Sequence, residues 1–284
     1  MTEWVTEELH DGLRSSFRAD RVLYRRPVGQ QDLVLYENPK FGRMLALDGV
    51  TQVTEADEFI YHEMLTHVPL LAHGNVRSVL IVGGGDGGML REVVRHPGVE
   101  RVTMVEIDEG VVTFSKEYLP KVSDGAFDDP RLDLVIADGA EYMRDAGDGF
   151  DVIIVDSTDP IGPGEVLFTD HFYGHAKRRL NEGGVLVTQN GVPFLQGAEL
   201  TGTMRAFGQL FADRTCYLAT VPTYVGGPMA FGFGTDDTSL RRVTVETLAD
   251  RYRQAGLSTR YYTPEVHRAA FALPGYVQEL LDAA

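Results

Sequence analysis

The sequence has one cysteine, Cys216, among its 284 residues, and it has no long apolar run. A single cysteine excludes an internal disulfide and a cysteine-rich zinc site, and it is compatible with a reducing compartment. No stretch approaches the roughly 20 apolar residues that a membrane helix needs. The first residues, MTEWVTEELHDG, lack the basic start and the apolar core of a signal peptide. We therefore expect a cytoplasmic protein without membrane contact.

Positive charge is also scarce. Lys and Arg together number 26 against 42 for Asp and Glu, which gives a formal net charge of −16. A chain this acidic is poorly suited to a phosphate backbone, so we do not expect nucleic acid as a partner. It suits a cationic ligand better, although acidity alone mostly confers solubility. The hydrophobic fraction of 43% is ordinary for a globular protein.

Two kinds of local pattern divide the chain. Residues 21–53 alternate short strand-like runs with turn pairs such as Asp48-Gly49, which predicts a small antiparallel β unit. Residues 55–73 carry apolar side chains at helical spacing until Pro69 interrupts the rhythm. The pattern predicts an N-terminal β domain over residues 1–55 and a helix that leads into a second domain, residues 56–284.

The second domain contains apolar runs separated by helical stretches: SVLIVG, RVTMVE, LDLVIA, DVIIVD and GVLVTQ. Continuous Val, Ile and Leu runs are typical of parallel strands that are buried on both faces. Their spacing suits βα units, so we expect a doubly wound, Rossmann-like α/β sheet. The runs CYLATVPTY and PMAFGFGT predict a closing antiparallel pair.

A glycine loop follows the first of these strands. In VLIVGGGDGGM, Gly83, Gly85 and Gly88 form a GxGxxG pattern; the neighbouring glycines are Gly84 and Gly87. Such a loop lets a ligand approach the backbone at a helix N-terminus, but a simple packing turn has the same pattern. Asp86 lies inside this loop, where it would repel a pyrophosphate and attract a cation.

Acidic residues follow the other strands. Glu106 ends the second strand, where it could accept hydrogen bonds from both ribose hydroxyls of a nucleoside. Asp138 and Gly139 follow the third strand; they could bind an adenine ring, or they could form an ordinary turn. Asp156 and Asp159 follow the fourth strand, at the sheet edge where open α/β sheets bind ligands, though either residue could only cap a turn.

Other segments could complete a site. Residues 161–167 contain glycine and proline and could form a lid that excludes water, or a plain loop. Tyr61, His62 and Tyr224 could enclose a cation, although aromatic residues without context are more often structural. Four acids around one crevice are tolerated when the crevice holds a cation.

Seven segments occur in this order along the chain: ALDGVTQVTEADEFIYHEM, LIVGGGDGGML, MVEIDEGVV, IADGAEY, DVIIVDSTDPIGPGEVLF, VPTYVGGPMAFGF and YYTPEVHRAAFALP. Together they resemble the polyamine aminopropyltransferases, and most closely the bacterial spermidine synthases. The resemblance extends from about Trp4 to Leu281. It implies a sheet of the class I methyltransferase type and a homodimer or larger homo-oligomer.

The resemblance implies an activity and a role for each matching residue. The activity is transfer of an aminopropyl group from decarboxylated S-adenosylmethionine, a co-substrate, to putrescine; no metal or cofactor is needed. The thioadenosine part of the donor would bind Gln31, Glu106, Asp138, Gly139 and Pro163. His62, Asp86 and Asp159 would contact amine groups, and the same cavity would be lined by Gln52, Tyr61 and Tyr224. Asp156 would accept the proton.

Three alternatives remain open at this stage. An S-adenosylmethionine-dependent methyltransferase would share the sheet, Glu106 and Asp138, but Asp86 would repel the carboxylate of its donor. A non-catalytic binding protein could have kept the fold, yet it would have no need of Asp156. An aminopropyltransferase could also use cadaverine, spermidine or agmatine as acceptor, because one methylene in a pocket is worth only about 1–3 kcal/mol.

Overall fold

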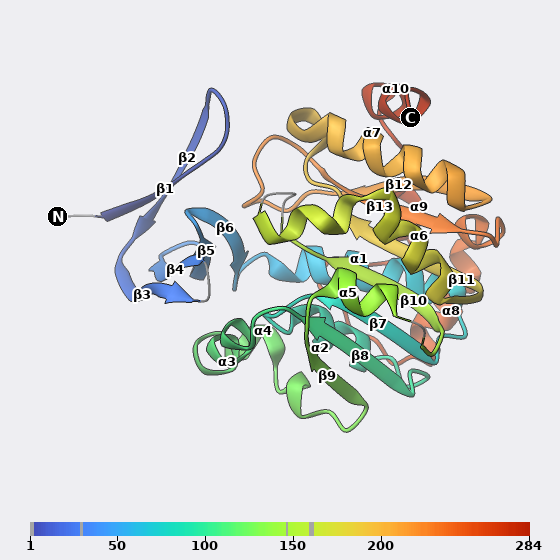
Figure 1. Ribbon diagram of the computed structural model, residues 1–284, viewed down its shortest axis with the longest axis horizontal. Helices are drawn as coiled ribbons and strands as arrows, with labels where there is room; N and C mark the ends of the chain where they lie inside the picture. The colour runs from blue at the N-terminus through green and yellow to red at the C-terminus, as the bar shows by residue number, and fades with distance from the viewer. Residues whose placement is uncertain (1–2, 29–30, 146, 159–161) are drawn as a thin grey trace.

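A seven-stranded sheet with helices on both faces forms the larger part of the molecule, and two small antiparallel sheets precede it (Figure 1). The structure, a computed structural model, describes residues 3–28, 31–145, 147–158 and 162–284. The expected combination of a doubly wound sheet with an N-terminal antiparallel β unit is confirmed.

The N-terminal part begins with the hairpin β1 (Glu3–His10) and β2 (Leu13–Ala19), which the sequence patterns did not predict. A four-stranded meander follows: β3 (Arg21–Val28), β4 (Gln31–Asn38), β5 (Gly42–Leu47) and β6 (Val50–Thr54). Asp48 and Gly49 both have positive φ, as a two-residue hairpin turn between β5 and β6 requires.

One face of the meander is apolar and packs on the second domain. Leu33, Leu35 and Leu45 are almost fully buried there, against Phe114 and Leu119. The covering elements are α3 (Glu109–Tyr118) and α4 (Pro120–Ser123). Because alternate residues of a strand face opposite sides, β4 buries its odd-numbered leucines on this contact.

The strands of the large sheet follow the order β12-β13-β11-β10-β7-β8-β9. They are β7 (Ser78–Gly83), β8 (Arg101–Glu106), β9 (Leu132–Ile136), β10 (Phe150–Asp156), β11 (Leu180–Gln189), β12 (Asp213–Ala219) and β13 (Met229–Thr235). The first five along the chain are parallel, and the last two close the sheet in antiparallel pairing, as predicted. The order reverses between β7 and β10, which is the place where doubly wound sheets bind ligands.

The helices form the outer layers. They are α1 (Glu58–His73), α2 (Gly88–Val94), α5 (Gly139–Arg144), α6 (Asp170–Arg179), α7 (Pro193–Leu210), α8 (Val245–Gln254), α9 (Pro264–Ala270) and α10 (Gly275–Asp282), with short 3₁₀ helices at Ala126–Asp128, Gly162–Phe168 and Leu240–Arg242. Along β7, Val79 and Ile81 pack toward α1, α2 and α8, whereas Leu80 and Val82 pack toward α5, α6 and α7. Each such buried side chain contributes about 1.5–3 kcal/mol, which explains the unbroken apolar runs in the sequence.

Helix α1 continues four residues beyond Pro69, which sequence reasoning treated as an interruption. A proline inside a helix removes one hydrogen bond. The residues after it, Leu70 and Leu71, are nonetheless 3% exposed and Ala72 is fully buried. Burial of this last turn against the sheet offsets the lost hydrogen bond, so tertiary packing overrides the local signal.

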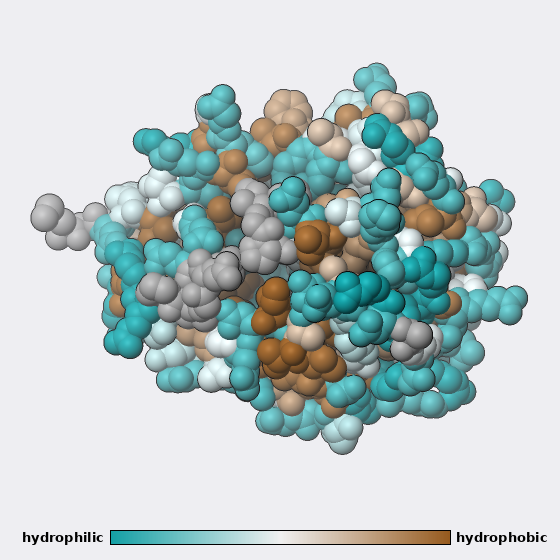
Figure 2. All heavy atoms as spheres, in the orientation of Figure 1, coloured by the Kyte–Doolittle hydropathy of each residue, from teal (hydrophilic) through white to brown (hydrophobic). Residues whose placement is uncertain are grey.

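The surface is mostly hydrophilic. Figure 2 shows polar side chains over much of one face, with a brown, apolar group near the β9 edge of the sheet. Exposed large apolar residues include Ile107, after β8, and Ile136, at the end of β9. In the part of the chain that the structure describes, no helix is long and apolar enough to cross a membrane.

Candidate active site

A cavity of about 530 Å³ opens at the carboxyl ends of the central strands. The predicted site residues that line it are Gln52, Tyr61, His62, Gly83, Gly84, Gly85, Asp86, Glu106, Asp138, Gly139, Asp156 and Tyr224. Asp159 and the side chains of Gln31 and Pro163 lie outside the described residues. These residues lie where the strand order reverses. The structure thus brings together residues that are up to 172 positions apart along the chain.

The glycine loop passes very close to neighbouring strands. A Cβ atom at Gly83 would overlap the carbonyl oxygen of Asp156, and one at Gly85 would lie 2.9 Å from Oε2 of Glu106. Gly84 has a φ of 76° and donates its N–H to the Asp156 carbonyl at 3.2 Å. Gly87 faces Phe127 and Ser123 rather than the cavity. The loop is therefore glycine-rich because side chains would fill the space between the strand ends.

Glu106, the last residue of β8, is 7% exposed. Its Oε1 accepts the Asp108 N–H at 3.0 Å. Burial raises the pKa of this carboxyl to about 7, with a smaller contribution from Asp156, although backbone N–H groups oppose the shift. A buried carboxyl with a strongly shifted pKa, in a cavity, is a feature of functional sites.

Asp138 is the N-cap of α5. Its Oδ1 accepts N–H groups of Ala140 at 2.7 Å and Glu141 at 3.2 Å. A Cβ at Gly139 would lie 2.6 Å from Cγ1 of Val82. The turn that sequence reasoning offered as the plain alternative is therefore present, and the same two residues line the cavity.

Asp156 ends β10, directly opposite Gly83 in the parallel register. Tyr61 of α1 donates its hydroxyl to Asp156 Oδ1 at 2.6 Å. Burial, and then repulsion by Asp86, raise the pKa of Asp156 to about 6, while His62 and the Tyr61 hydrogen bond lower it. At neutral pH this is an ionised carboxylate that binds a proton more readily than an ordinary aspartate does.

Asp86 lies in the glycine loop, opposite His62. Its Oδ1 accepts the Gly88 N–H at 2.7 Å, and its Oδ2 is 3.5 Å from His62 Nε2. Burial would raise the pKa of Asp86, but the charge and hydrogen bond of His62, the Gly88 N–H and the charge of Arg91 together outweigh burial and lower it. The two acids therefore differ: Asp86 stays ionised as an electrostatic anchor, whereas Asp156 is poised to bind a proton.

Aromatic side chains form one wall. The rings of Tyr61 and Tyr224 meet edge to face at 6.1 Å. The Tyr224 hydroxyl donates to the carbonyl of Gln52 at 2.5 Å, which joins β6 to the loop before β13. Asp57 strengthens this junction, since it accepts both the N–H and the hydroxyl of Thr223 at 2.9 and 2.7 Å.

Sequence reasoning missed several residues of the cavity. Glu7, Leu9 and His10 reach it from β1, a hairpin that no residue pattern predicted. Gln189 also lines it, and its amide donates to the Ser157 carbonyl at 3.3 Å. A signal for Gln189 was available, because it ends the parallel strand β11 beside β10.

Among the described residues no group of three or more His, Cys, Asp or Glu side chains could hold a metal ion.

Comparison with known proteins identifies the family. Residues 58–244 match the spermine/spermidine synthase domain, and residues 3–55 match the spermidine synthase tetramerisation domain. The chain belongs to the spermine/spermidine synthase family. The family resemblance read from the seven sequence segments is confirmed, and the chain is an enzyme of the aminopropyltransferase class.

Individual relatives of this family match almost the whole chain. A polyamine aminopropyltransferase of Ruegeria sp. (strain TM1040) is 65% identical over 277 residues, 98% of each chain. Polyamine aminopropyltransferase 1 of Pseudomonas aeruginosa is 57% identical over 97% of this chain and 96% of its own. A spermidine synthase in complex with the transition-state analogue AdoDATO has a TM-score of 0.93 at 38% identity, covering 99% of this chain and 96% of its own. The spermidine synthase from Thermotoga maritima has a TM-score of 0.90 at 37% identity, with coverage of 99% and 95%.

Proposed function

We propose that the protein is a spermidine synthase, which transfers the aminopropyl group of decarboxylated S-adenosylmethionine to putrescine. The products are spermidine and 5′-methylthioadenosine. The observation that carries this proposal is the pair Asp86 and Asp156 at one cavity, one held ionised and the other with a pKa near 6. A site for two cationic substrates, one of which must lose a proton, needs both kinds of carboxylate.

The donor's nucleoside would bind along the ends of β8 and β9. Glu106 would accept the ribose hydroxyls, and Asp138 would accept the adenine amino group through Oδ2, because Oδ1 caps α5. Gly139 would let the ring approach the backbone. Gln31 and Pro163 belong to this set by family resemblance. The sulfonium would then lie among the acids of the cavity, whose charge favours a cation.

The reaction is one in-line displacement. The lone pair of a putrescine amine attacks the aminopropyl carbon that carries the sulfur. The carbon–sulfur bond breaks, and its electron pair remains on the sulfur as a neutral thioether. Before this attack, the ammonium form of the amine gives one proton to Asp156, on Oδ2 because Tyr61 occupies Oδ1. The reactive cation arrives with the donor, so we propose that the reaction needs neither a cofactor nor a metal.

Proton transfer from an ammonium to an aspartate is unfavourable in water, where their pKa values differ by roughly 6 units. The site narrows that difference, because burial and Asp86 raise the pKa of Asp156 to about 6. Desolvation also disfavours the ammonium form of the amine. Asp86, Asp159 and His62 would fix the amine groups, Gln52, Tyr61 and Tyr224 would line the space around them, and residues 161–167 would close it.

The charge of the site argues against the main rival activity. A methyltransferase would have to bind the carboxylate of S-adenosylmethionine, and the lowered pKa of Asp86 keeps a negative charge in its place. A purely binding protein would have no use for a part-buried Tyr61–Asp156 pair. Putrescine is the acceptor that the family resemblance favours over cadaverine or agmatine.

We further propose that the chain forms a homodimer or a larger homo-oligomer in the cytoplasm, through residues 3–55. The match of this segment to a tetramerisation domain supports the proposal. So does Trp4 of β1, which is 57% exposed in the single chain, because large exposed aromatic residues are enriched at interfaces.

The test is an assay of the purified protein with decarboxylated S-adenosylmethionine or with S-adenosylmethionine, each paired with putrescine, cadaverine, agmatine and spermidine. Mass spectrometry follows 5′-methylthioadenosine and the amine products. Spermidine formed only from putrescine and the decarboxylated donor is the expected result. A methylated amine with S-adenosylhomocysteine would identify a methyltransferase, and no product from any pair would point to a binding protein.

A further inference from the structure

Helix α1 carries a second acid one turn before His62. Glu58 is 8% exposed, and its Oε2 lies 2.6 Å from His62 Nδ1. On the other side of the ring, His62 Nε2 faces Asp86 Oδ2 at 3.5 Å. Ionised carboxylates only accept hydrogen bonds, so a ring between two of them is satisfied when both of its nitrogens carry a proton. The geometry therefore favours an imidazolium at His62.

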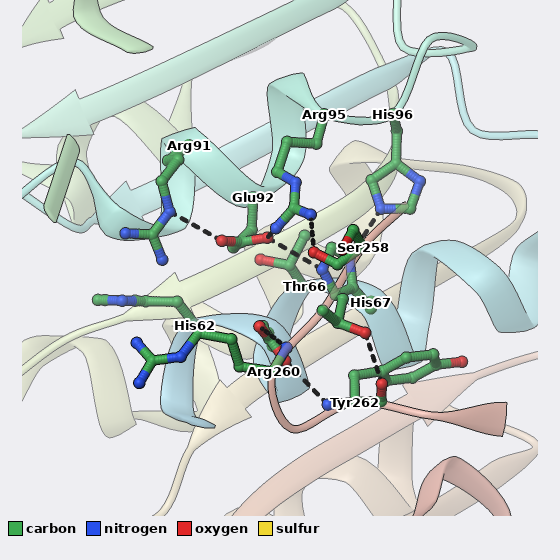
Figure 3. A network of polar contacts seen from close by, with 12 residues as sticks. His62, Thr66, His67, Arg91, Glu92, Arg95, His96, Ser258, Arg260 and Tyr262 are labelled. Atoms are coloured by element: carbon green, nitrogen blue, oxygen red, sulfur yellow. Dashed lines mark hydrogen bonds and ion pairs between the residues drawn. The ribbon is translucent and has the colours of Figure 1, made fainter. Parts of the chain in front are cut away.

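Glu58 is itself fixed by helix α2. Arg91 donates from Nη1 to Glu58 Oε1 at 3.0 Å and from Nη2 to Oε2 at 2.9 Å, a bidentate pair. Its Nε donates to Glu92 at 2.8 Å. Figure 3 shows the contact of Arg91 with Glu92, which lies between Arg91 and His67. Bidentate pairing fixes orientation as well as charge, so the carboxylate of Glu58 has little freedom to turn away from His62.

The imidazole ring also packs tightly against the start of α2. A Cβ atom at Gly88 would overlap the His62 ring. The ring is 2% exposed, so solvent cannot take the place of its partners. The contact holds the His62 ring between its two acids, and the absence of a side chain at Gly88 is what permits it.

We propose that Glu58 is a positioning residue, which fixes His62 as an imidazolium against Asp86 and thereby keeps one positive charge among the acids of the cavity. The consequence for turnover rests on the proposed function, whereas the state of His62 does not. Glu58 touches neither reacting group in this account; it acts through His62. The effect on catalysis follows because a neutral His62 would leave the negative charges of Asp86 and Asp156 without the positive charge that offsets them.

The charged groups around the His62 ring come from four elements. They are Glu58 of α1, Asp86 of the glycine loop, Arg91 of α2 and Asp156 of β10, with the neutral Tyr61 ring at 5.3 Å. Burial alone would lower the pKa of His62, but Asp86 and Glu58 raise it to about 10. His62 in turn lowers the pKa of both Asp86 and Asp156.

The chain offers a matched control one turn further along α1. Glu63 is 2% exposed, and its carboxylate accepts backbone N–H groups of Arg260, Tyr261 and Tyr262, each at 2.8 Å. It tethers a loop and has no bond to His62. A Glu63→Gln variant therefore removes an equally buried negative charge from the same helix without changing the partners of the ring.

The experiment is an NMR titration of the histidine Cε1 signals in deuterated protein labelled at that carbon, without substrate. The chain has eight histidines, and a His62→Gln variant assigns the signal. A hydrogen bond to a charged group is worth about 1.5–3 kcal/mol. We therefore expect Glu58→Gln to lower the pKa of His62 by about 1–2 units. Glu63→Gln should lower the melting temperature and leave the His62 titration unchanged.

Steady-state kinetics of the same variants provide the second test. At pH 9, where the lowered pKa leaves much of His62 neutral in the variant, Glu58→Gln should reduce kcat/KM by about two- to tenfold. The reduction should be smaller at pH 6.5, where His62 is protonated in both proteins. In a His62→Gln background the same substitution should add less than a twofold change, because its only route to the site is gone. Glu58→Asp keeps the charge but shortens the side chain, and it should recover part of the loss.

Two results would overturn the proposal: a His62 that is neutral at pH 7.5 in the unmodified protein, or a Glu58→Gln variant whose His62 titrates as before. If the titrations come out as expected but no aminopropyl transfer is seen with any acceptor, the proposed function fails and the role of Glu58 toward His62 stands. A loss of folding in Glu58→Gln moves the test to Glu58→Asp, where a smaller drop in the His62 pKa is required.

Discussion

The hydroxyl of Tyr61 donates to Oδ1 of Asp156 across 2.6 Å, from helix α1 to the end of strand β10. The two residues are 95 positions apart in the sequence. The bond orients the carboxylate through Oδ1, and in the proposed function Oδ2 would face the substrate. It also favours the charged form of Asp156, and so it works against the burial that raises the pKa of that group. The hydrogen bond therefore helps to set the pH at which the carboxylate can act as a base.

Tyr61→Phe should move the acid limb of the pH profile upward. In the unmodified enzyme we expect kcat/KM to fall below about pH 6, where Asp156 becomes protonated. The lost hydrogen bond is worth about 0.5–1.5 kcal/mol, so the limb should shift by roughly 0.4–1 unit toward higher pH. The check is a profile of kcat/KM between pH 5 and 9. A limb that stays in place, or moves down, would separate Tyr61 from the ionisation of Asp156.

Asp156→Asn should abolish most turnover and leave donor binding intact. The amide keeps the shape of the side chain and an oxygen for Tyr61, but it cannot take the proton, so kcat should fall by about 10²–10⁴. Calorimetry with 5′-methylthioadenosine should show affinity within about threefold of the unmodified protein. Asp151→Asn is the control: this acid is the second residue of the same strand and accepts the Ser78 N–H at 3.0 Å. It should lower stability without changing kcat.

The same Asp156→Asn substitution should stabilise the protein at alkaline pH. The pKa of Asp156 is raised to about 6 in the folded state, against about 4 in an unfolded chain. The stability linked to this group is therefore fully present below about pH 4 and is lost as the pH rises through about 6. Removing the charge should raise the stability by about 1–3 kcal/mol at pH 8, and by about half as much at pH 5. Thermal unfolding at the two pH values measures the difference, and an equal change at both would contradict the raised pKa.

How far could the sequence alone lead to this site? The apolar runs located all five parallel strands, because strands buried on both faces leave an unbroken signal. The topology of a doubly wound sheet then collects the acids that follow those strands, which is why Glu106 and Asp156 could be singled out without a structure. The class of chemistry followed from charge: an acid in the glycine loop suits a cation.

What the sequence could not supply are contacts between distant segments. The residue pattern does not reveal that Arg91 donates a hydrogen bond to Glu58, or that Glu7 of β1 lines the cavity. Both depend on the docking of one element on another. Pro69 was misleading for the same reason, because the packing of the helix end outweighs its local effect. Residue patterns reveal periodicity along the chain, whereas contacts between side chains that are distant in sequence can be seen only in the folded structure.

Asp86→Asn should reduce the preference of the enzyme for decarboxylated S-adenosylmethionine over S-adenosylmethionine. In the proposed function, the ionised Asp86 would attract the amine end of the decarboxylated donor and repel the carboxylate of S-adenosylmethionine. Losing one charge interaction of this kind is worth about 1–3 kcal/mol, or 5- to 150-fold in the ratio of the two affinities. Competition of S-adenosylmethionine against the decarboxylated donor measures that ratio. An unchanged ratio would mean that another group rejects the carboxylate.

Gly88→Ala should displace His62 and reduce activity, although alanine is a better helix former than glycine. A methyl group at this position would overlap the His62 ring, so the ring or the start of α2 must shift. We expect a loss of kcat/KM of at least tenfold, together with a lower melting temperature. Gly202→Ala is the control, because this glycine also lies in a helix, α7, and a Cβ there meets no atom within 4 Å. It should stabilise the protein by about 0.5–1 kcal/mol and leave kcat unchanged. If both variants behave alike, the close contact between Gly88 and His62 does not constrain the site.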